Sequence, residues 1–88
     1  MIKFDWITKN DGYDCEVETP TLAFRIHKEF EYKNKAIKYA LWYGGYSERN
    51  SFKYGLTLCH FTVNTLDQAK ICAENFLKEK FFNYFMEV

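Results

Sequence analysis

The stretch GLTLCHFTVNTLDQAK, residues 55–70, predicts a β-strand that runs directly into a capped α-helix. Thr65 is a typical N-cap residue, and Gln68 three positions later completes a capping-box pattern that satisfies two backbone donors at the helix start. The expected strand, residues 54–63, carries apolar residues on both of its faces. This pattern favours a central strand, or a strand whose outer face contacts another molecule or segment. The junction therefore predicts a C-terminal helix that folds back across the sheet.

The expected helix carries one stripe of residues at spacings of three and four. The stripe consists of Leu66, Ala69, Ala73, Phe76, Leu77 and Lys80. Such a stripe is typical of a helix that packs on a sheet, and small residues within it allow a close approach. Lys70, Glu74 and Lys78 follow at four-residue spacing on the opposite side, and we expect them to face solvent.

Apolar residues alternate with polar ones upstream of this junction, which predicts three short strands before residue 30. Their inward-facing sets are Ile2, Phe4 and Trp6, then Tyr13, Cys15 and Val17, then Leu22, Phe24 and Ile26. Asp11-Gly12 supplies a turn after the first strand, and Pro20 ends the second because proline cannot donate to a ladder. The opposite alternation, which includes Glu16, Glu18, Arg25 and His27, is expected to face solvent.

Residues 36–43 fit two structures, because Ile37, Ala40 and Leu41 also match a helical face. A strand is favoured, since Tyr39, Leu41 and Tyr43 continue the period of two and a pair of glycines follows. Residues 45–53 are then an exposed, mobile connection. The whole chain, residues 1–88, is expected to form one α+β domain, an antiparallel sheet of four or five strands with one C-terminal helix packed on one face.

The chain carries no pattern typical of catalysis, of a metal site or of a cofactor. Its three cysteines have neither CxxC nor CxxH spacing, and Cys59 and His60, as neighbours on a strand, point to opposite faces. No secretory signal and no apolar run of membrane-spanning length is present. These observations predict a non-enzymatic protein of the cytoplasm with reduced thiols and no membrane contact.

Aromatic residues make up 20% of the chain, more rings than such a small core can enclose, while the formal net charge is zero. Several rings are therefore expected at the surface, where they are typical of protein interfaces, and self-association as a homodimer is plausible. The aromatic tail, residues 81–86, is either core that wraps the sheet edge or part of this patch. The residues predicted to bind another protein are Trp42, Tyr46, Arg49, Phe81, Phe82, Tyr84 and Phe85.

A second interpretation is a small nucleic-acid-binding domain, in which rings on the sheet stack bases between basic residues. The residues that would carry it are Arg25, Lys38, Trp42, Arg49, Lys53 and Tyr54. The balanced charge argues against a polyanion partner, whose binding site usually has an excess of lysine and arginine. Nucleic acid is therefore the alternative rather than the leading hypothesis.

The order of these motifs resembles that of a loose group of small phage and prophage proteins. The matching positions are Trp6, Thr19-Pro20, the FRI of 24–26, the YALWY of 39–43 and the VNTLDQAKICAE of 63–74. The resemblance extends to about residue 81; Cys72 replaces the usual alanine, and the aromatic tail is not part of the pattern. Most such proteins have no assigned activity. Because small phage proteins commonly bind and block a host protein, the resemblance implies an inhibitor of a host target such as a defence complex, in the anti-CRISPR manner.

Overall fold

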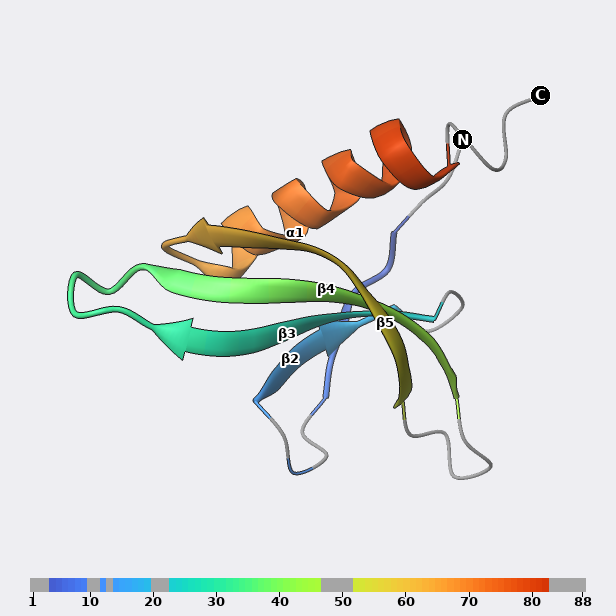
Figure 1. Ribbon diagram of the computed structural model, residues 1–88, viewed down its shortest axis with the longest axis horizontal. Coiled ribbons are helices and arrows are strands. Elements are labelled where there is room, and N and C mark those ends of the chain that lie inside the picture. The colour runs from blue at the N-terminus through green and yellow to red at the C-terminus, as the bar shows by residue number, and fades with distance from the viewer. Residues whose placement is uncertain (1–3, 10–11, 13, 20–22, 47–51, 83–88) are drawn as a thin grey trace.

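The computed structural model describes residues 4–9, 12, 14–19, 23–46 and 52–82, with the side chain of Phe82 excepted. Five strands form one antiparallel sheet in sequential order: β1 (Ile7–Thr8), β2 (Cys15–Glu18), β3 (Phe24–Glu31), β4 (Ile37–Tyr46) and β5 (Phe52–Val63). Helix α1 (Leu66–Phe76) follows β5 and continues as a π-helical segment, η1 (Leu77–Phe82). The helix lies along one face of the sheet (Figure 1). The predicted α+β fold, with one C-terminal helix on an antiparallel sheet, is confirmed.

The main core lies between α1 and the middle of the sheet. Its buried members are Val17, Phe24, Ile26, Tyr39, Leu41, Ala69, Ala73 and Leu77. Ala69 and Ala73 are completely buried, so the helix does approach the sheet through its small residues. The predicted capping box is present: the Thr65 hydroxyl accepts from the Gln68 amide at 3.2 Å, and Gln68 Oε1 accepts from the Thr65 amide at 3.3 Å.

The predicted first strand is wrong in its position. The part of it that the structure describes, residues 4–6, precedes β1, which begins at Ile7. The indole Nε1 of Trp6 donates to Glu74 Oε2 at 2.6 Å, so this segment is bound to the helix rather than to a neighbouring strand. Glu74 is accordingly half-buried instead of facing solvent.

Residues 37–46 form a strand, as the alternation of Tyr39, Leu41 and Tyr43 indicates. The predicted connection over 45–53 is too long, because β4 continues through both glycines to Tyr46 and β5 already begins at Phe52. The two strands come very close at Gly44 and Gly55: a Cβ atom on Gly55 would lie 2.6 Å from the carbonyl oxygen of Tyr43. Glycine therefore lets the hairpin continue, and only residues 47–51, which lie outside the described residues, separate the strands.

Strand β5 lies at the edge of the sheet, so the interpretation as a central strand is wrong. The register explains the apolar pattern: Leu41 pairs with Cys59 and Trp42 with Thr57, which leaves Leu58 as an extra residue in a bulge. Leu58 and Cys59 consequently both pack against the helix-side core instead of pointing to opposite faces. The bulge, rather than burial on both faces of β5, therefore explains why apolar residues follow one another in this strand.

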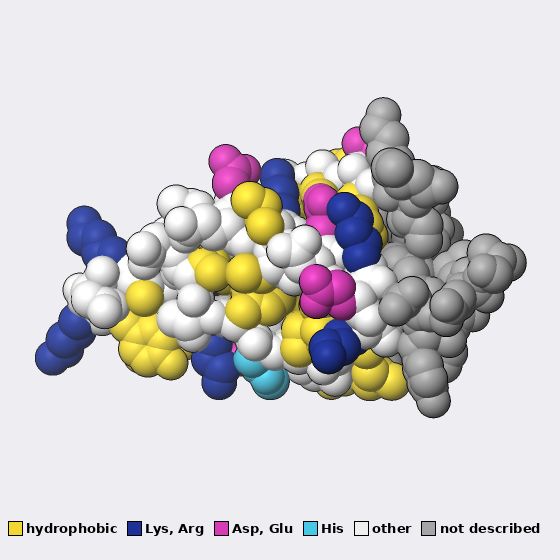
Figure 2. Space-filling model, turned by 90° about the horizontal axis from the view of Figure 1, so that it is seen from above, with side chains coloured by type: hydrophobic (Ala, Val, Ile, Leu, Met, Phe, Trp, Pro, Cys, Tyr) yellow, Lys and Arg dark blue, Asp and Glu magenta, His cyan; other side chains and the backbone are white. Residues whose placement is uncertain are grey.

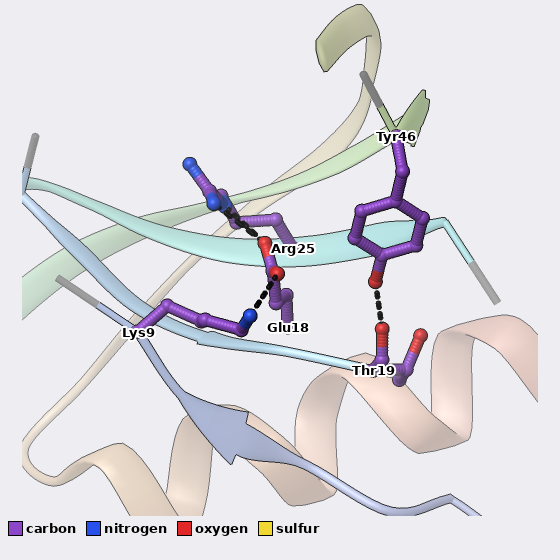
Figure 3. A network of polar contacts seen from close by, with 5 residues as sticks. All are labelled: Lys9, Glu18, Thr19, Arg25 and Tyr46. Carbon is purple, nitrogen blue, oxygen red and sulfur yellow. Dashed lines mark hydrogen bonds and ion pairs between the residues drawn. The ribbon is translucent and has the colours of Figure 1, made fainter. Parts of the chain in front are cut away.

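The sheet face opposite the helix has a second, polar core. Glu18 and Arg25 were expected to face solvent, yet they are 1% and 2% exposed. Nη2 of Arg25 lies 2.5 Å from Glu18 Oε2, and Lys9 Nζ lies 3.6 Å from Glu18 Oε1 (Figure 3). The buried ring of Phe52 covers the guanidinium, whose Cζ is 4.7 Å from the ring centroid. Alternation alone could not reveal the burial of Arg25, because the ring that covers it comes from Phe52 at the start of β5.

Candidate functional site: an apolar groove beside an edge strand

An open groove of about 650 Å³ lies between the β4–β5 hairpin and the C-terminal part of the helix. Its lining residues are Tyr43, Leu56, Leu58, Phe76, Lys80 and Phe81. Five of these side chains are aliphatic or aromatic, and the sixth is a lysine. The volume is within the usual range of roughly 300–1,000 Å³ for ligand-binding clefts.

The strand register and ring packing position the walls of the groove. Tyr43 and Leu56 are directly paired across β4 and β5, so their side chains lie on the same face of the sheet. The ring of Phe81 packs edge-on against Phe24 at a centroid distance of 5.4 Å and lies tilted against Tyr43 at 5.3 Å. These contacts hold Phe81 in place as one wall. Leu56 remains 50% exposed and Tyr43 39% exposed, so apolar surface is available to another molecule.

The helix-side face of the molecule carries exposed hydrophobic side chains. Figure 2 shows them as several groups, with lysine, arginine and acidic side chains lying among and around them. Exposed apolar surface next to charged side chains is typical of protein interaction sites.

The charge beside the groove is basic. Among the residues that the structure describes, Lys80 has no carboxylate within ion-pair distance. Strand β5 contributes the exposed Lys53 but contains no Asp or Glu. A partner with carboxylates would therefore meet complementary charge here.

The predicted protein-binding residues are only partly brought together. Phe81 lines the groove, whereas Trp42 lies on the opposite face of the sheet, and the hydroxyl of Tyr46 donates to the carbonyl oxygen of Thr19 (Figure 3). Arg49, Tyr84, Phe85 and the side chain of Phe82 lie outside the described residues.

Sequence reasoning missed most of the groove. Phe76 was expected to pack on the sheet, and Leu56 and Leu58 were expected on one face of the strand 54–63, without an assignment of any of them to a binding site. The Gly55-Leu56 pair was the available signal, because an isolated glycine inside a strand pattern indicates a bulge.

The opposite face carries a smaller pocket of about 190 Å³, lined by Arg25, Trp42, Phe52 and Tyr54. Trp42 stacks on His27 at 4.1 Å and meets Tyr54 edge-on at 4.8 Å. Three of the predicted nucleic-acid contacts, Arg25, Trp42 and Tyr54, are thus close together. Arg25, however, is buried against Glu18, so the prediction that Arg25 contacts nucleic acid at the surface is wrong.

The remaining basic candidates for nucleic-acid contact differ in their surroundings. Lys38 Nζ lies 4.0 Å from Glu29 Oε1, so its charge is partly offset. Lys53 is exposed next to Tyr54. Arg49 lies in the segment that the structure leaves undescribed.

The cysteines are free thiols, and Cys59 is packed against the core. Burial, with a smaller effect of the neighbouring Cys72, raises the pKa of the Cys59 thiol to about 11. A thiol with such a pKa is a poor nucleophile at neutral pH. His60 is exposed on the other face, with Nε2 3.3 Å from Glu29 Oε1. Over the described ranges of the chain, no three His, Cys, Asp or Glu residues are grouped as a metal site would require.

No family model matches the chain, and neither a curated protein nor a solved structure is significantly similar to it. Within the described part, neither α1 nor η1 combines the length and the apolar character that crossing a membrane requires.

Proposed function

We propose that this chain is a non-enzymatic protein-binding module whose binding surface is the groove between the β4–β5 hairpin and the end of the helix. The observation that carries the proposal is the apolar lining of an open groove in which Leu56 and Tyr43 stay exposed. Following the resemblance to phage proteins, the target is a host protein in the cytoplasm, such as a defence complex, which binding would block.

The composition and rigidity of the groove support this proposal. Tyrosine and phenylalanine are enriched at the centres of protein interfaces, where buried rings dominate the binding energy. Phe81 is already held between Phe24 and Tyr43. A wall that is ordered before binding loses little conformational entropy when a partner arrives, which favours affinity.

The proposal is tested by comparing two exposed apolar residues. Leu56 lines the groove, whereas Phe30 is similarly exposed, at 56%, but lies near the β3–β4 turn, where it pairs with Lys38. Wild type, Leu56→Ser and Phe30→Ser are immobilised, and the proteins that each captures from a host lysate are quantified. We expect Leu56→Ser to reduce the recovered partner by about tenfold or more, in the range of an interface hot spot. Phe30→Ser should recover as much as wild type.

The outcome that contradicts the proposal is equal recovery by wild type and Leu56→Ser. Thermal unfolding of both variants controls for folding, because both side chains are at least half exposed and their loss should leave the midpoint nearly unchanged.

Nucleic-acid binding is the second candidate, and the pocket formed by Trp42, Tyr54, Phe52 and Arg25 is the observation that favours it. The chain has two tryptophans, so in a Trp6→Phe background the fluorescence reports Trp42 alone. Base stacking on Trp42 would give saturable quenching by oligothymidine or oligouridine that weakens with added salt. An unchanged emission at low salt removes this candidate.

A further inference from the structure

Strand β5 presents an open edge of the sheet. It pairs with β4 on one side, and no other strand in the described part of the chain pairs with it on the other. The strand runs from Phe52 to Val63, twelve residues, which is long for an edge that carries no protecting partner. Alternate backbone N–H and C=O groups of such an edge are directed away from the sheet, where another extended segment can pair with them.

Two hollows lie beside this edge on the helix side. The first is the groove at Leu56 and Leu58, and the second, of about 410 Å³, lies at the other end of β5. The second hollow is lined by Thr62, Val63, Asn64, Gln68, Ile71 and Cys72. About five residues of β5 separate them, or roughly 17 Å at ~3.3 Å per residue. A strand laid along β5 would place alternate side chains over both.

The charge of the edge favours an acidic partner over a second copy of this chain. Lys80 and Lys53 lie beside the edge, and Lys80 has no carboxylate nearby among the described residues. Strand β5 of another copy would itself supply no Asp or Glu to these lysines, because neither occurs in residues 52–63. A segment that carries its own carboxylates would supply them.

We infer that β5 and the groove bind an extended acidic and apolar segment of the partner protein, which adds to the sheet as a sixth strand. The inference rests on the proposed function and names the chemistry of the partner at the same groove. Backbone hydrogen bonds to β5 contribute affinity. Specificity comes from two features of the bound segment. Its apolar side chains, four or six positions apart, enter the two hollows, and one of its carboxylates lies near Lys80.

The probe is a displayed library of random peptides, selected on the full chain and counter-selected on Leu56→Ser. We expect the selected peptides to share apolar residues at even spacings and to contain Asp or Glu. Lys80→Glu should weaken a selected peptide about tenfold, the effect of placing like charges in contact. Lys78→Glu is the matched control, because Lys78 lies over the ring of Phe4 and does not line the groove.

The second readout tests strand pairing directly. The best peptide is resynthesised with one N-methyl group at each position in turn. Because only every second N–H of an added strand pairs with β5, methylation at alternate positions should abolish binding, while the intervening positions tolerate it. Amide hydrogen exchange of β5 should slow at alternate residues in the complex.

Several results would overturn the inference. They are peptides with apolar spacings of three and four, uniform sensitivity to N-methylation, or no peptide that depends on Leu56. A doubled solution mass that reverts in Leu56→Ser would identify a second copy as the occupant. Tighter peptide binding after removal of residues 83–88 would identify the chain's own tail. None of these contradicts protein binding at the groove, which the capture experiment decides separately.

Discussion

The carboxylate of Glu18 and the guanidinium of Arg25 form an almost completely buried ion pair on the sheet face that α1 leaves uncovered. Oε2 of Glu18 accepts from both Nη2, at 2.5 Å, and Nε, at 3.1 Å, of Arg25. The residues pair directly across β2 and β3, seven positions apart in the chain. The ring of Phe52, from the start of β5, is buried and lies over the Arg25 guanidinium.

Loss of one member of this pair should be far more damaging than loss of both. Glu18→Leu or Arg25→Met leaves a buried charge without its partner, which costs about 3–5 kcal/mol of unfolding free energy. The double variant Glu18→Leu/Arg25→Met should be destabilised much less than the sum of the two, because no unpaired charge remains. Urea unfolding of the four proteins gives the coupling energy.

Lys9→Met is the control for this cycle. Lys9 also approaches Glu18, at 3.6 Å, but its side chain is 41% exposed. Its removal should cost about 1 kcal/mol or less. Additive effects of the Glu18 and Arg25 substitutions would contradict the description of the pair as one buried unit.

The close approach of β4 and β5 predicts a difference between two glycines. Gly55→Ala places a methyl group 2.6 Å from the Tyr43 carbonyl oxygen, so the backbones must separate. We expect a loss of about 1–3 kcal/mol in unfolding free energy, as for overpacking elsewhere. A Cβ atom on Gly45 meets nothing within 4 Å, and Gly45→Ala should be nearly neutral. Equal stabilities of the two variants would show that the strands do not pack as described.

The Cys59 thiol predicts a loss of stability at alkaline pH. Burial raises its pKa to about 11 in the folded protein, above the ~8.5 of an exposed thiol. As pH rises from about 9 to 11 the unfolded chain loses this proton first, so the unfolding free energy falls. Burial also raises the pKa values of Tyr39 and Tyr46, which act in the same direction.

Cys59→Ala isolates the thiol from the tyrosines. Its unfolding free energy should fall less steeply over this pH range than that of wild type, while the tyrosine contribution remains. Identical slopes for the two proteins would show that the thiol is not protected by the fold.

Local signals in the sequence predicted the helix and most of the strands, whereas contacts between distant residues determine which side chains are buried. The capping box of Thr65 and Gln68, and the alternation through Tyr39, act within a few residues, and both led to correct predictions. The burial of Arg25 depends on Phe52, twenty-seven positions away, which no local pattern reports.

The candidate site was harder to predict because bulges change which side chains share a face. Strict alternation separates Leu58 from Cys59, but the extra residue in β5 places both on the helix side. Among the predicted protein-binding residues whose side chains the structure describes, Phe81 lies in the groove. The strand register, rather than the aromatic content of the sequence, therefore determines which residues line the groove.

The central claim is that a partner protein occupies the groove, and leucine methyl resonances test it most directly. Methyl-labelled protein is titrated with the purified captured partner. The methyl signals of Leu56 and Leu58, which line the groove, should shift or broaden, while that of Ile7, exposed on β1, should not. Unchanged Leu56 and Leu58 methyl signals at a saturating concentration of the partner would contradict the claim.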